Sequence, residues 1–231
     1  MKTLGIVGGL GPESTVDYYR SIITRYRERK RDGSYPALII DSLDFQRARR
    51  LVEAEALGEL AEYLLGALQR LASAGADFGL FAAVTPHIVF DAVCRESPIP
   101  LLSIVEATCA TAKAAGFRKV GLLGTRFTMG ARFFPEVFEK ASITLVVPTE
   151  DEQAYIHDRY LGELVNGVFR SETREQLVEI IRSMKKRESI DAVILGGTEL
   201  PLILRDAGDL GIPFLDTALI HVQSAVEILV S

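Results

Sequence analysis

The chain has 231 residues, of which 48% are hydrophobic, and a formal net charge of −5 at pH 7. This length and apolar content allow a full globular core in one large domain or two small ones. The basic runs at 25–31 and 185–187 have acidic neighbours, which indicates exposed helix faces rather than a nucleic-acid-binding surface. No run reaches the roughly 18 apolar residues of a membrane span, and the first residues lack the apolar core of a signal peptide, so we expect a cytoplasmic protein without a membrane partner.

Short apolar runs alternate with longer amphipathic runs along the whole chain. This alternation predicts an α/β fold in which helices flank parallel sheets, and the short, largely apolar runs are typical of buried parallel strands. The expected strands are 3–7, 37–41, 78–82, 101–104, 120–123, 144–147, 192–195 and 214–215.

Helices are expected between these strands. The run 53–74 places Leu60, Leu64, Leu68 and Leu71 on one stripe and ends before Gly75. The later helices are expected at 88–93, 151–166, 173–187, 200–204 and 217–230, and that at 173–187 has Leu177, Ile180, Ile181 and Met184 on its inner face. By contrast, the loop 42–51 has little internal pattern.

Three blocks of the first half recur in the second half in the same order: 2–8 matches 119–124, 76–83 matches 190–197, and 99–103 matches 212–216. This repetition indicates an internal duplication. We therefore expect two pseudo-symmetric α/β domains, residues 1–103 together with 217–231 and residues 104–216. Because ligands of such sheets bind beyond the carboxyl ends of the strands, a ligand cleft is expected between the domains, at turns 8–14, 83–87, 124–128 and 196–200.

The turn 8–14 reads GGLGPES and opens a helix. Backbone amides at such a start favour an anion or a carboxylate, which makes Leu10 and Gly11 candidate ligand contacts. A dinucleotide site is not expected, because the GxGxxG spacing is absent and Pro12 removes one donor. A tight strand-to-helix turn with Pro12 in the first helical turn explains the glycines equally well.

The turns 83–87 and 196–200 end corresponding strands with hydroxyl and titratable side chains. Thr85 and Thr198 can hydrogen-bond a carboxylate, and His87 and Glu199 are the candidate acid/base groups. The alternative is structural: Thr85 caps a helix that begins near His87, and Glu199 lies at the positive end of another helix. For the two titratable residues taken singly, the structural interpretation is favoured, whereas the symmetry-related positions of the two turns taken as a pair favour a site.

The turn 124–128 adds Thr125 and Thr128 as candidate contacts, and Arg126 as a residue that can pair with an acidic ligand or lie at the surface. No metal is expected, because His157 and His221 lack ligand spacing, and Cys94 and Cys109 form no CxxC or Cys/His motif.

Taken together, these motifs resemble the aspartate/glutamate racemase family, whose members racemise amino acids without pyridoxal phosphate. The resemblance covers the whole chain and rests on GGLGPES with YYR at 18–20, DF at 44–45, TPH at 85–87, GT at 124–125, PTEDEQ at 148–153 and GGTE at 196–199. It implies two pseudo-symmetric α/β domains, a homodimer, an amino-acid substrate between the domains and no cofactor. By resemblance, Arg49 is expected to contact a carboxylate.

Active members of the family use one cysteine on each side of the substrate. By motif, these cysteines fall on Ala83 and Gly197, and a neighbouring asparagine falls on Val84, which makes Val84 a candidate substrate contact by position. A thiol has a pKa near about 8.5 and reaches both proton states, whereas a methyl group or a hydrogen cannot exchange protons. The two-cysteine mechanism is therefore not expected here.

Two main hypotheses follow. The first is an isomerase that uses Glu199 and His87 on a small carboxylate, and the second is a non-catalytic carboxylate-binding or regulatory protein on the same scaffold. Two weaker alternatives are an engineered chain whose cysteines were replaced, for which glycine at position 197 is a less natural choice than alanine or serine, and a lyase, whose relatives still require a cysteine.

Overall fold

The structure is a computed structural model that describes residues 2–205 and 207–231, and its chain divides into two units. The first unit comprises Met1–Ile104 and His221–Ser231, and the second comprises Val105–Ile220. The sequence placed the corresponding boundaries after residues 103 and 216. None of the helices in the described part of the chain combines the length and hydropathy that a membrane span needs.

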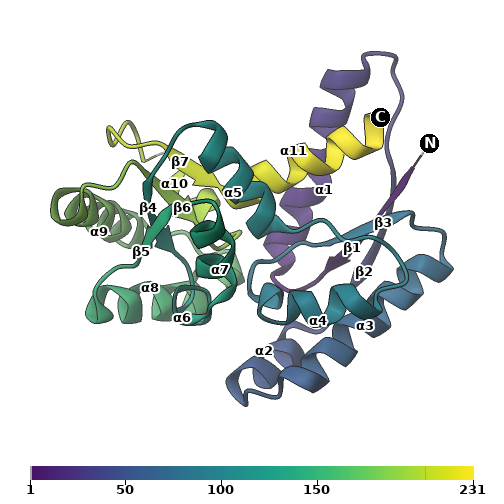
Figure 1. The fold of residues 1–231 in the computed structure, drawn as a ribbon, viewed down its shortest axis with the longest axis horizontal. Coiled ribbons are helices and arrows are strands. Elements are labelled where there is room, and N and C mark those ends of the chain that lie inside the picture. Colours follow the sequence, from purple (N-terminus) through teal and green to yellow (C-terminus); the bar gives the residue numbers. More distant parts are fainter. Residues whose placement is uncertain (1, 206) are drawn as a thin grey trace. The chain divides into compact units, whose positions relative to one another are not determined.

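The first unit is built on a three-stranded parallel sheet of order β2-β1-β3 (Figure 1). The central strand pairs with both neighbours, so that Val7 lies opposite Asp41 on one side and Phe81 on the other. The elements are β1 (Thr3–Gly8), α1 (Pro12–Lys30), β2 (Ala37–Ser42), α2 (Phe45–Glu53), α3 (Leu57–Ser73), β3 (Phe78–Phe81), the 3₁₀ helix η1 (Thr85–Val89), α4 (Phe90–Glu96) and most of α11 (Thr217–Val230).

The second unit contains a four-stranded parallel sheet of order β5-β4-β6-β7. The α/β class with helix-flanked parallel sheets is thus confirmed. The elements are α5 (Ile104–Ala114), β4 (Lys119–Leu123), α6 (Arg126–Gly130), α7 (Phe133–Lys140), β5 (Thr144–Val146), α8 (Glu150–Gly162), the 3₁₀ helix η2 (Leu164–Asn166), α9 (Ser171–Glu188), β6 (Ala192–Leu195), α10 (Leu200–Leu204) and β7 (Phe214–Asp216).

Three expectations for the first unit differ from the structure. The helix expected at 53–74 is α3, which begins only at Leu57, because Glu55 has a left-handed φ of 52° that interrupts the chain between α2 and α3. The loop expected at 42–51 is mostly α2, whose first turn is capped by Asp44, the side chain of which accepts from the N–H of Gln46. The strand expected at 101–104 is an isolated bridge between Gly79 and Leu101.

The same backbone hydrogen bonds recur in the two units at the start of the paired strands. In the first unit the N–H of Asp77 donates to the carbonyl of Thr3 at 2.9 Å, and in the second the N–H of Asp191 donates to Lys119 at 2.7 Å. Each aspartate also accepts from its partner strand, from the N–H of Thr3 at 2.6 Å and from that of Lys119 at 3.0 Å. These matching contacts support the internal duplication.

The ends of the paired strands match as well. The N–H of Ala82 donates to the carbonyl of Val7 at 3.0 Å, and the N–H of Gly196 donates to the carbonyl of Leu123 at 2.7 Å. In both units, therefore, the turn that leaves β3 or β6 begins beside the end of the neighbouring strand, β1 or β4. This placement brings the candidate turns of each unit to one edge of its sheet.

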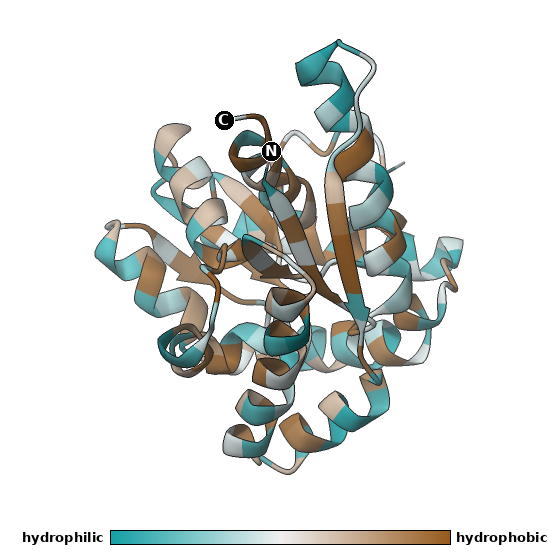
Figure 2. Cartoon of the chain, turned by 90° about the vertical axis from the view of Figure 1, so that its right-hand side faces the viewer, coloured by the Kyte–Doolittle hydropathy of each residue, from teal (hydrophilic) through white to brown (hydrophobic). Residues whose placement is uncertain are grey.

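Apolar side chains fill the space between strands and helices, and most strand residues are strongly hydrophobic (Figure 2). In the second unit Ile156 and Tyr160 of α8 and Leu177 and Met184 of α9 pack in one buried cluster. Burial of the predicted inner face of α9 is confirmed, since Leu177, Ile180, Ile181 and Met184 are all buried.

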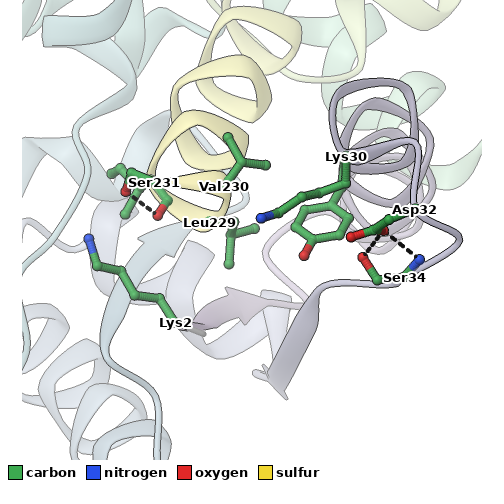
Figure 3. Close-up of a pocket in the computed structure, with 9 residues that line it drawn as sticks. Lys2, Lys30, Asp32, Ser34, Leu229, Val230 and Ser231 are labelled. Atoms are coloured by element: carbon green, nitrogen blue, oxygen red, sulfur yellow. Dashed lines mark hydrogen bonds between the residues drawn. The ribbon is translucent and has the colours of Figure 1, made fainter.

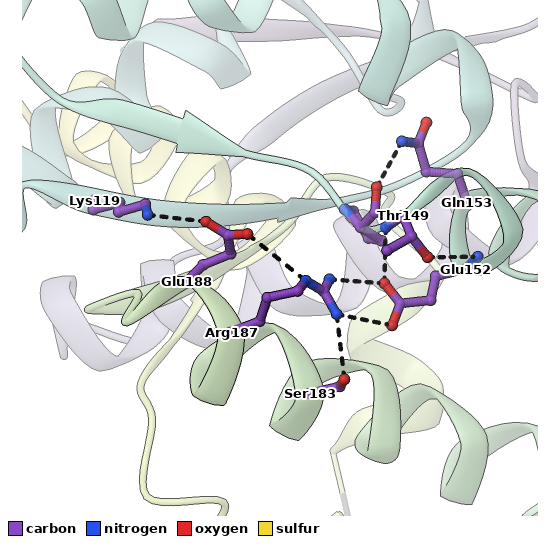
Figure 4. Close-up of polar contacts among 8 residues, drawn as sticks. Lys119, Thr149, Glu152, Gln153, Ser183, Arg187 and Glu188 are labelled. Atoms are coloured by element: carbon purple, nitrogen blue, oxygen red, sulfur yellow. Dashed lines mark hydrogen bonds and ion pairs between the residues drawn. The ribbon is translucent and has the colours of Figure 1, made fainter.

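Exposed and half-buried charges connect α9 with α8 and β4 (Figure 4). Arg187 pairs with Glu152 at 3.0 Å, and Lys119 pairs with Glu188 at 3.0 Å. The Glu152 carboxylate also accepts from the N–H of Thr149, which completes a capping box at the start of α8. Because exposed ion pairs add little stability, these contacts contribute less to the packing of α8 and α9 than their buried apolar cluster does.

Candidate functional site

The glycine-rich turn after β1 is ordered by its own hydrogen bonds. Gly9 has a φ of 76°, and its N–H donates to the hydroxyl of Thr15 at 2.9 Å. A side chain at Gly9 would collide with the backbone of Leu43. Gly11 is the N-cap of α1, Pro12 follows in the first turn, and Leu10 is buried. These contacts show that the tight turn itself requires glycine. A ligand role for Leu10 and Gly11 stays a prediction.

Ser14 links this turn to the end of β3, a contact that was not expected. Its hydroxyl donates to the carbonyl of Ala82 at 2.9 Å, and the side chain is buried. The hydroxyl therefore satisfies a buried carbonyl at the strand end. A serine in the first turn of a helix carries no sequence signal for a partner 68 residues away.

His87 lies in η1 with both ring nitrogens in contact with the backbone. Nε2 accepts from the N–H of Ile104 at 3.2 Å, so Nδ1 carries the proton and donates to the carbonyl of Val84 at 3.0 Å. Burial, reinforced by the nearby His221, lowers the pKa of His87 to about 3. A neutral ring with both nitrogens engaged favours the structural interpretation of His87.

The rest of this turn is apolar or partly buried. Ala83 and Val84 are 4% and 3% exposed, and Val84 is the N-cap residue of η1. Thr85 is half-buried inside η1 and makes no side-chain capping bond there. The carboxyl end of β3 therefore presents two hydrocarbon side chains where the family motif has polar ones.

Arg49, the expected carboxylate contact, lies on α2. Its Nε pairs with Glu53 one turn later at 2.8 Å, and its side chain is 36% exposed. Arg47 on the same helix stacks over the ring of Tyr63, with 4.3 Å between its Cζ and the ring centroid. The structure thus gives both arginines protein partners, and a ligand contact for Arg49 stays a prediction.

In the second unit, Thr125 and Thr128 form a buried hydroxyl pair at the end of β4. Thr125 is the N-cap of α6 and accepts from the N–H of Thr128 at 3.3 Å, and the two hydroxyl oxygens are 3.3 Å apart. The bond between the hydroxyls uses one of their two protons. Arg126 is exposed, and its N–H donates to Nδ1 of His157 at 3.3 Å.

Glu199 follows β6 and is held by side chains from two elements. The hydroxyl of Tyr160, on α8, donates to Oε2 of Glu199 in a short hydrogen bond, and the hydroxyl of Thr198 donates to the same oxygen at 3.1 Å. Glu199 and Thr198 are 2% and 3% exposed. Burial and the neighbouring carboxylate raise the pKa of Tyr160 well above its ordinary value, so the phenol stays protonated and is a donor.

Tyr160 also occupies the space beside Gly197. A Cβ added to Gly197 would lie 2.5 Å from Cε2 of the Tyr160 ring and 2.7 Å from its hydroxyl oxygen. Cβ atoms in proteins do not approach other heavy atoms so closely, because interiors are packed to van der Waals contact. Glycine at 197 and tyrosine at 160 therefore fit each other. Sequence reasoning missed Tyr160, because nothing in the spacing of α8 points to β6.

The ends of β4 and β6 lie in direct contact. A Cβ at Gly124 would lie 2.7 Å from the carbonyl oxygen of Gly196, and one at Gly196 would lie 3.3 Å from Cγ2 of Thr128. Only glycines allow this approach of the two backbones. The approach brings the hydroxyl pair of Thr125 and Thr128 next to the turn that carries Glu199.

A groove lies elsewhere in the first unit. It is lined by Lys2, Tyr26, Lys30, Asp32 and Ser34 together with the end of α11; Lys2 directly precedes β1, and Lys30 is the last residue of α1 (Figure 3). Within the described residues, no cluster of three or more His, Cys, Asp or Glu side chains is arranged to bind a metal ion.

Comparison with known proteins identifies the family. The model of the Asp/Glu/Hydantoin racemase family matches residues 7–225. The fold resembles a candidate Asp/Glu racemase from Yersinia pestis (TM-score 0.90, 30% identity) and an aspartate racemase homologue from Pyrococcus horikoshii OT3 (TM-score 0.85, 37% identity), each with 100% of both chains covered. A glutamate racemase from Actinobacillus pleuropneumoniae is 27% identical over 121 residues, which are 52% of this chain and 43% of that protein. The chain belongs to the Asp/Glu/Hydantoin racemase family.

Proposed function

We propose that this protein binds a small carboxylate, such as an acidic amino acid, at the strand-end turns of its second unit, and that racemisation by two thiols is not its reaction. The relatives named as aspartate and glutamate racemases support the class of ligand. The observation that carries the proposal is the pairing of Gly197 with Tyr160, which leaves no room for a thiol at that position.

The corresponding strand end of the first unit, after β3, supports the same conclusion. Two-base racemisation needs a proton donor on one face of the α-carbon and a base on the other. Ala83 and Val84 cannot exchange protons, and the His87 ring is neutral with both nitrogens bound to backbone. Of the two candidate acid/base groups, His87 and Glu199, only Glu199 therefore remains a candidate.

The hydroxyl pair of Thr125 and Thr128 is the proposed contact for a ligand carboxylate. One hydroxyl proton remains after the bond between them, and both side chains lie at the end of β4 beside the Gly196 backbone. Because the hydroxyl of Thr198 already donates to Glu199, its proposed role is to hold that carboxylate.

Titration calorimetry with L-Asp, L-Glu and their D forms tests the binding role. We expect saturable binding, weakened about tenfold by Thr128→Val, since a hydrogen bond to a charged group contributes roughly 1.5–3 kcal/mol. The matched control is Thr111→Val on α5, an exposed hydroxyl that donates to Ala107 within its own helix. Equal affinities of both variants would argue against Thr128 as a contact, and no binding of any of the four ligands would remove the proposal.

A second candidate function is an isomerase in which Glu199 moves the α-proton without a thiol. It is supported by a buried carboxylate that two hydroxyls fix at a strand end. Proton NMR in D2O tests it through loss of the α-proton signal above a heat-killed control. Exchange together with formation of the other enantiomer, both abolished by Glu199→Gln, would establish this isomerase, whereas ligand binding without exchange would leave the binding role.

We further propose that the protein is a homodimer. In the first unit, α1 exposes Val16 and Tyr19, each 46% exposed, one turn apart, and the edge strand β2 exposes Ile40 at 39%. Ile40 lies on the α1 side of the sheet, since a Cβ at Gly8 would meet both Thr15 and Ile40. A second copy would cover this apolar strip, which we define as Val16, Tyr19 and Ile40.

A further inference from the structure

His157 of α8 holds the start of α6 through one ring nitrogen. Its Nδ1 accepts from the N–H of Arg126 at 3.3 Å, so the neutral ring carries its proton on Nε2. The same ring meets the ring of Phe127 edge to face, with 5.6 Å between the centroids. His157 is 8% exposed and, like Tyr160 three residues later, belongs to the buried face of α8. This face therefore contacts both strand-end turns of the second unit, through His157 the turn after β4 and through Tyr160 the turn after β6.

The peptide group between Thr125 and Arg126 is held at both ends. The carbonyl of Thr125 accepts from the N–H of Met129 at 2.9 Å. At the other end of the group, the N–H of Arg126 donates to His157. Because a peptide group is planar, these two bonds fix the orientation of the whole group. Arg126 is the first residue of α6, and the first N–H groups of a helix have no partner within the helix, so His157 supplies the acceptor from α8.

The orientation of this peptide group decides where the hydroxyl pair lies. Thr125 is the N-cap of α6 in an extended conformation, and its hydroxyl accepts from the N–H of Thr128 at 3.3 Å. The two hydroxyl oxygens are also 3.3 Å apart, so a rotation of the group that follows Thr125 would displace the cap and the pair together. Without an acceptor at 157, the N–H of Arg126 would turn toward another partner, because an unsatisfied donor below the surface is costly.

We propose that His157 is a positioning residue whose Nδ1 keeps the hydroxyl pair of Thr125 and Thr128 oriented for the ligand. This inference rests on the proposed carboxylate-binding function and adds to it a residue that acts on the ligand only through the turn. The structural alternative is that the His157 ring serves only to pack against Phe127. Two substitutions separate these roles: His157→Asn keeps an acceptor oxygen close to the place of Nδ1 and loses the ring, whereas His157→Phe keeps a ring and has no acceptor.

Calorimetry with L-aspartate and L-glutamate compares the variants. His157→Phe should bind about fivefold more weakly than the unaltered protein, because the apparent affinity falls with the fraction of molecules whose turn is correctly oriented. His157→Asn should stay within about twofold for the same reason. Asp158→Asn, at the exposed next residue of α8, is the matched control and should bind like the unaltered protein. Without ligand, hydrogen exchange of the Arg126 amide, followed by NMR, should be slow in the unaltered protein and in His157→Asn and faster in His157→Phe.

Urea unfolding shows whether each variant is folded, and His157→Leu, which is smaller than phenylalanine and also lacks an acceptor, replaces His157→Phe if that variant is not. Normal binding by His157→Phe, or equal losses in the asparagine and phenylalanine variants, would reduce His157 to a packing residue and overturn this inference while leaving the carboxylate-binding function intact. Fast exchange of the Arg126 amide in the unaltered protein would overturn it whatever the ligand. Binding of neither amino acid by the unaltered protein would overturn the inference together with the proposed function.

Discussion

The ring of Tyr160 lies where any side chain at Gly197 would begin. An added Cβ would be 2.5 Å from Cε2 and 2.9 Å from Cζ of that ring. Tyr160 is only 6% exposed and packs in the core cluster of the second unit, so it has little room to move aside. The packing of this unit therefore requires glycine at 197. A cysteine introduced at 197 alone would collide with the ring of Tyr160.

Gly197→Cys should lower the free energy of unfolding by about 1–3 kcal/mol, because it overpacks a filled space. Adding Tyr160→Ala should make the same cysteine less destabilising, measured as a coupling energy in a double-mutant cycle of urea unfolding. Gly162→Ala on α8 is the control, since a Cβ there meets nothing within 4 Å. Additive effects at 197 and 160 would contradict the steric pairing.

Acid should destabilise the first unit through its buried histidines. Nε2 of His221 donates to the carbonyl of Leu102 at 3.1 Å, Nδ1 accepts from the hydroxyl of Tyr18 at 2.9 Å, and burial lowers the pKa of His221 to about 4. Burial likewise lowers the pKa of His87 to about 3. Since the unfolded chain takes up these protons near about pH 6.5, stability is fully present above that pH and is lost as the pH falls toward 4.

Urea unfolding between pH 7.5 and 4.5 measures this loss. The decrease attributable to His221 should be on the order of a few kcal/mol, because a shift of one pKa unit corresponds to about 1.4 kcal/mol. His221→Gln should be less stable at pH 7.5 and show a shallower decrease on acidification. If the variant and the unaltered protein lost stability in parallel, proton uptake by His221 would not be the cause.

The sequence predicted the class of fold and the order of its elements, because the apolar runs of β1, β3, β4 and β6 are buried throughout or nearly so. It failed between residues 42 and 57, where a left-handed Glu55 and the Asp44 cap, rather than a change in hydrophobic period, decide where helices begin and end. Periodicity carries no information about a single residue's φ.

The candidate site was predicted in part for a similar reason. Apolar runs predict where strands end. They therefore predicted that Thr125, Thr198 and Glu199 lie in turns that follow strand ends. Tyr160 could not be found this way, because it reaches β6 from α8, 39 residues earlier in the chain. The hydrogen bonds of the two His87 ring nitrogens could not be predicted either, since their partners are backbone atoms with no residue signature.

The apolar strip of Val16, Tyr19 and Ile40 predicts a dimer that a charge would disrupt. Tyr19→Asp should convert a dimer into a monomer in size-exclusion chromatography with light scattering, because burying an unpaired carboxylate at an interface is costly. Val168→Asp, at a position 39% exposed in the second unit, is the control and should remain dimeric. A monomeric unaltered protein at micromolar concentration would contradict the proposed homodimer.

Asp191 provides a final test, because it secures β4 to the start of β6. Its Oδ2 accepts from the N–H groups of Lys119 at 3.0 Å and Arg118 at 2.8 Å, and these bonds, that of Lys119 first, lower its pKa. Asp191→Ala should cost about 1 kcal/mol at pH 7, as loss of a backbone cap does. Since the folded pKa lies below the unfolded value, the contribution is present above about pH 4 and is lost as the pH falls through the folded pKa.

Urea unfolding at pH 7 and pH 3 should therefore show the difference between Asp191→Ala and the unaltered protein shrinking in acid. Asp77→Ala, in the first unit, removes the corresponding acceptor for the N–H of Thr3 and should cost a similar amount at pH 7. Asp158→Ala, an exposed residue on α8, is the control and should change little. A cost at Asp191 with none at Asp77 would show that the repeated hydrogen bond does not contribute equally to the two units, since Asp191 also accepts from the N–H of Arg118.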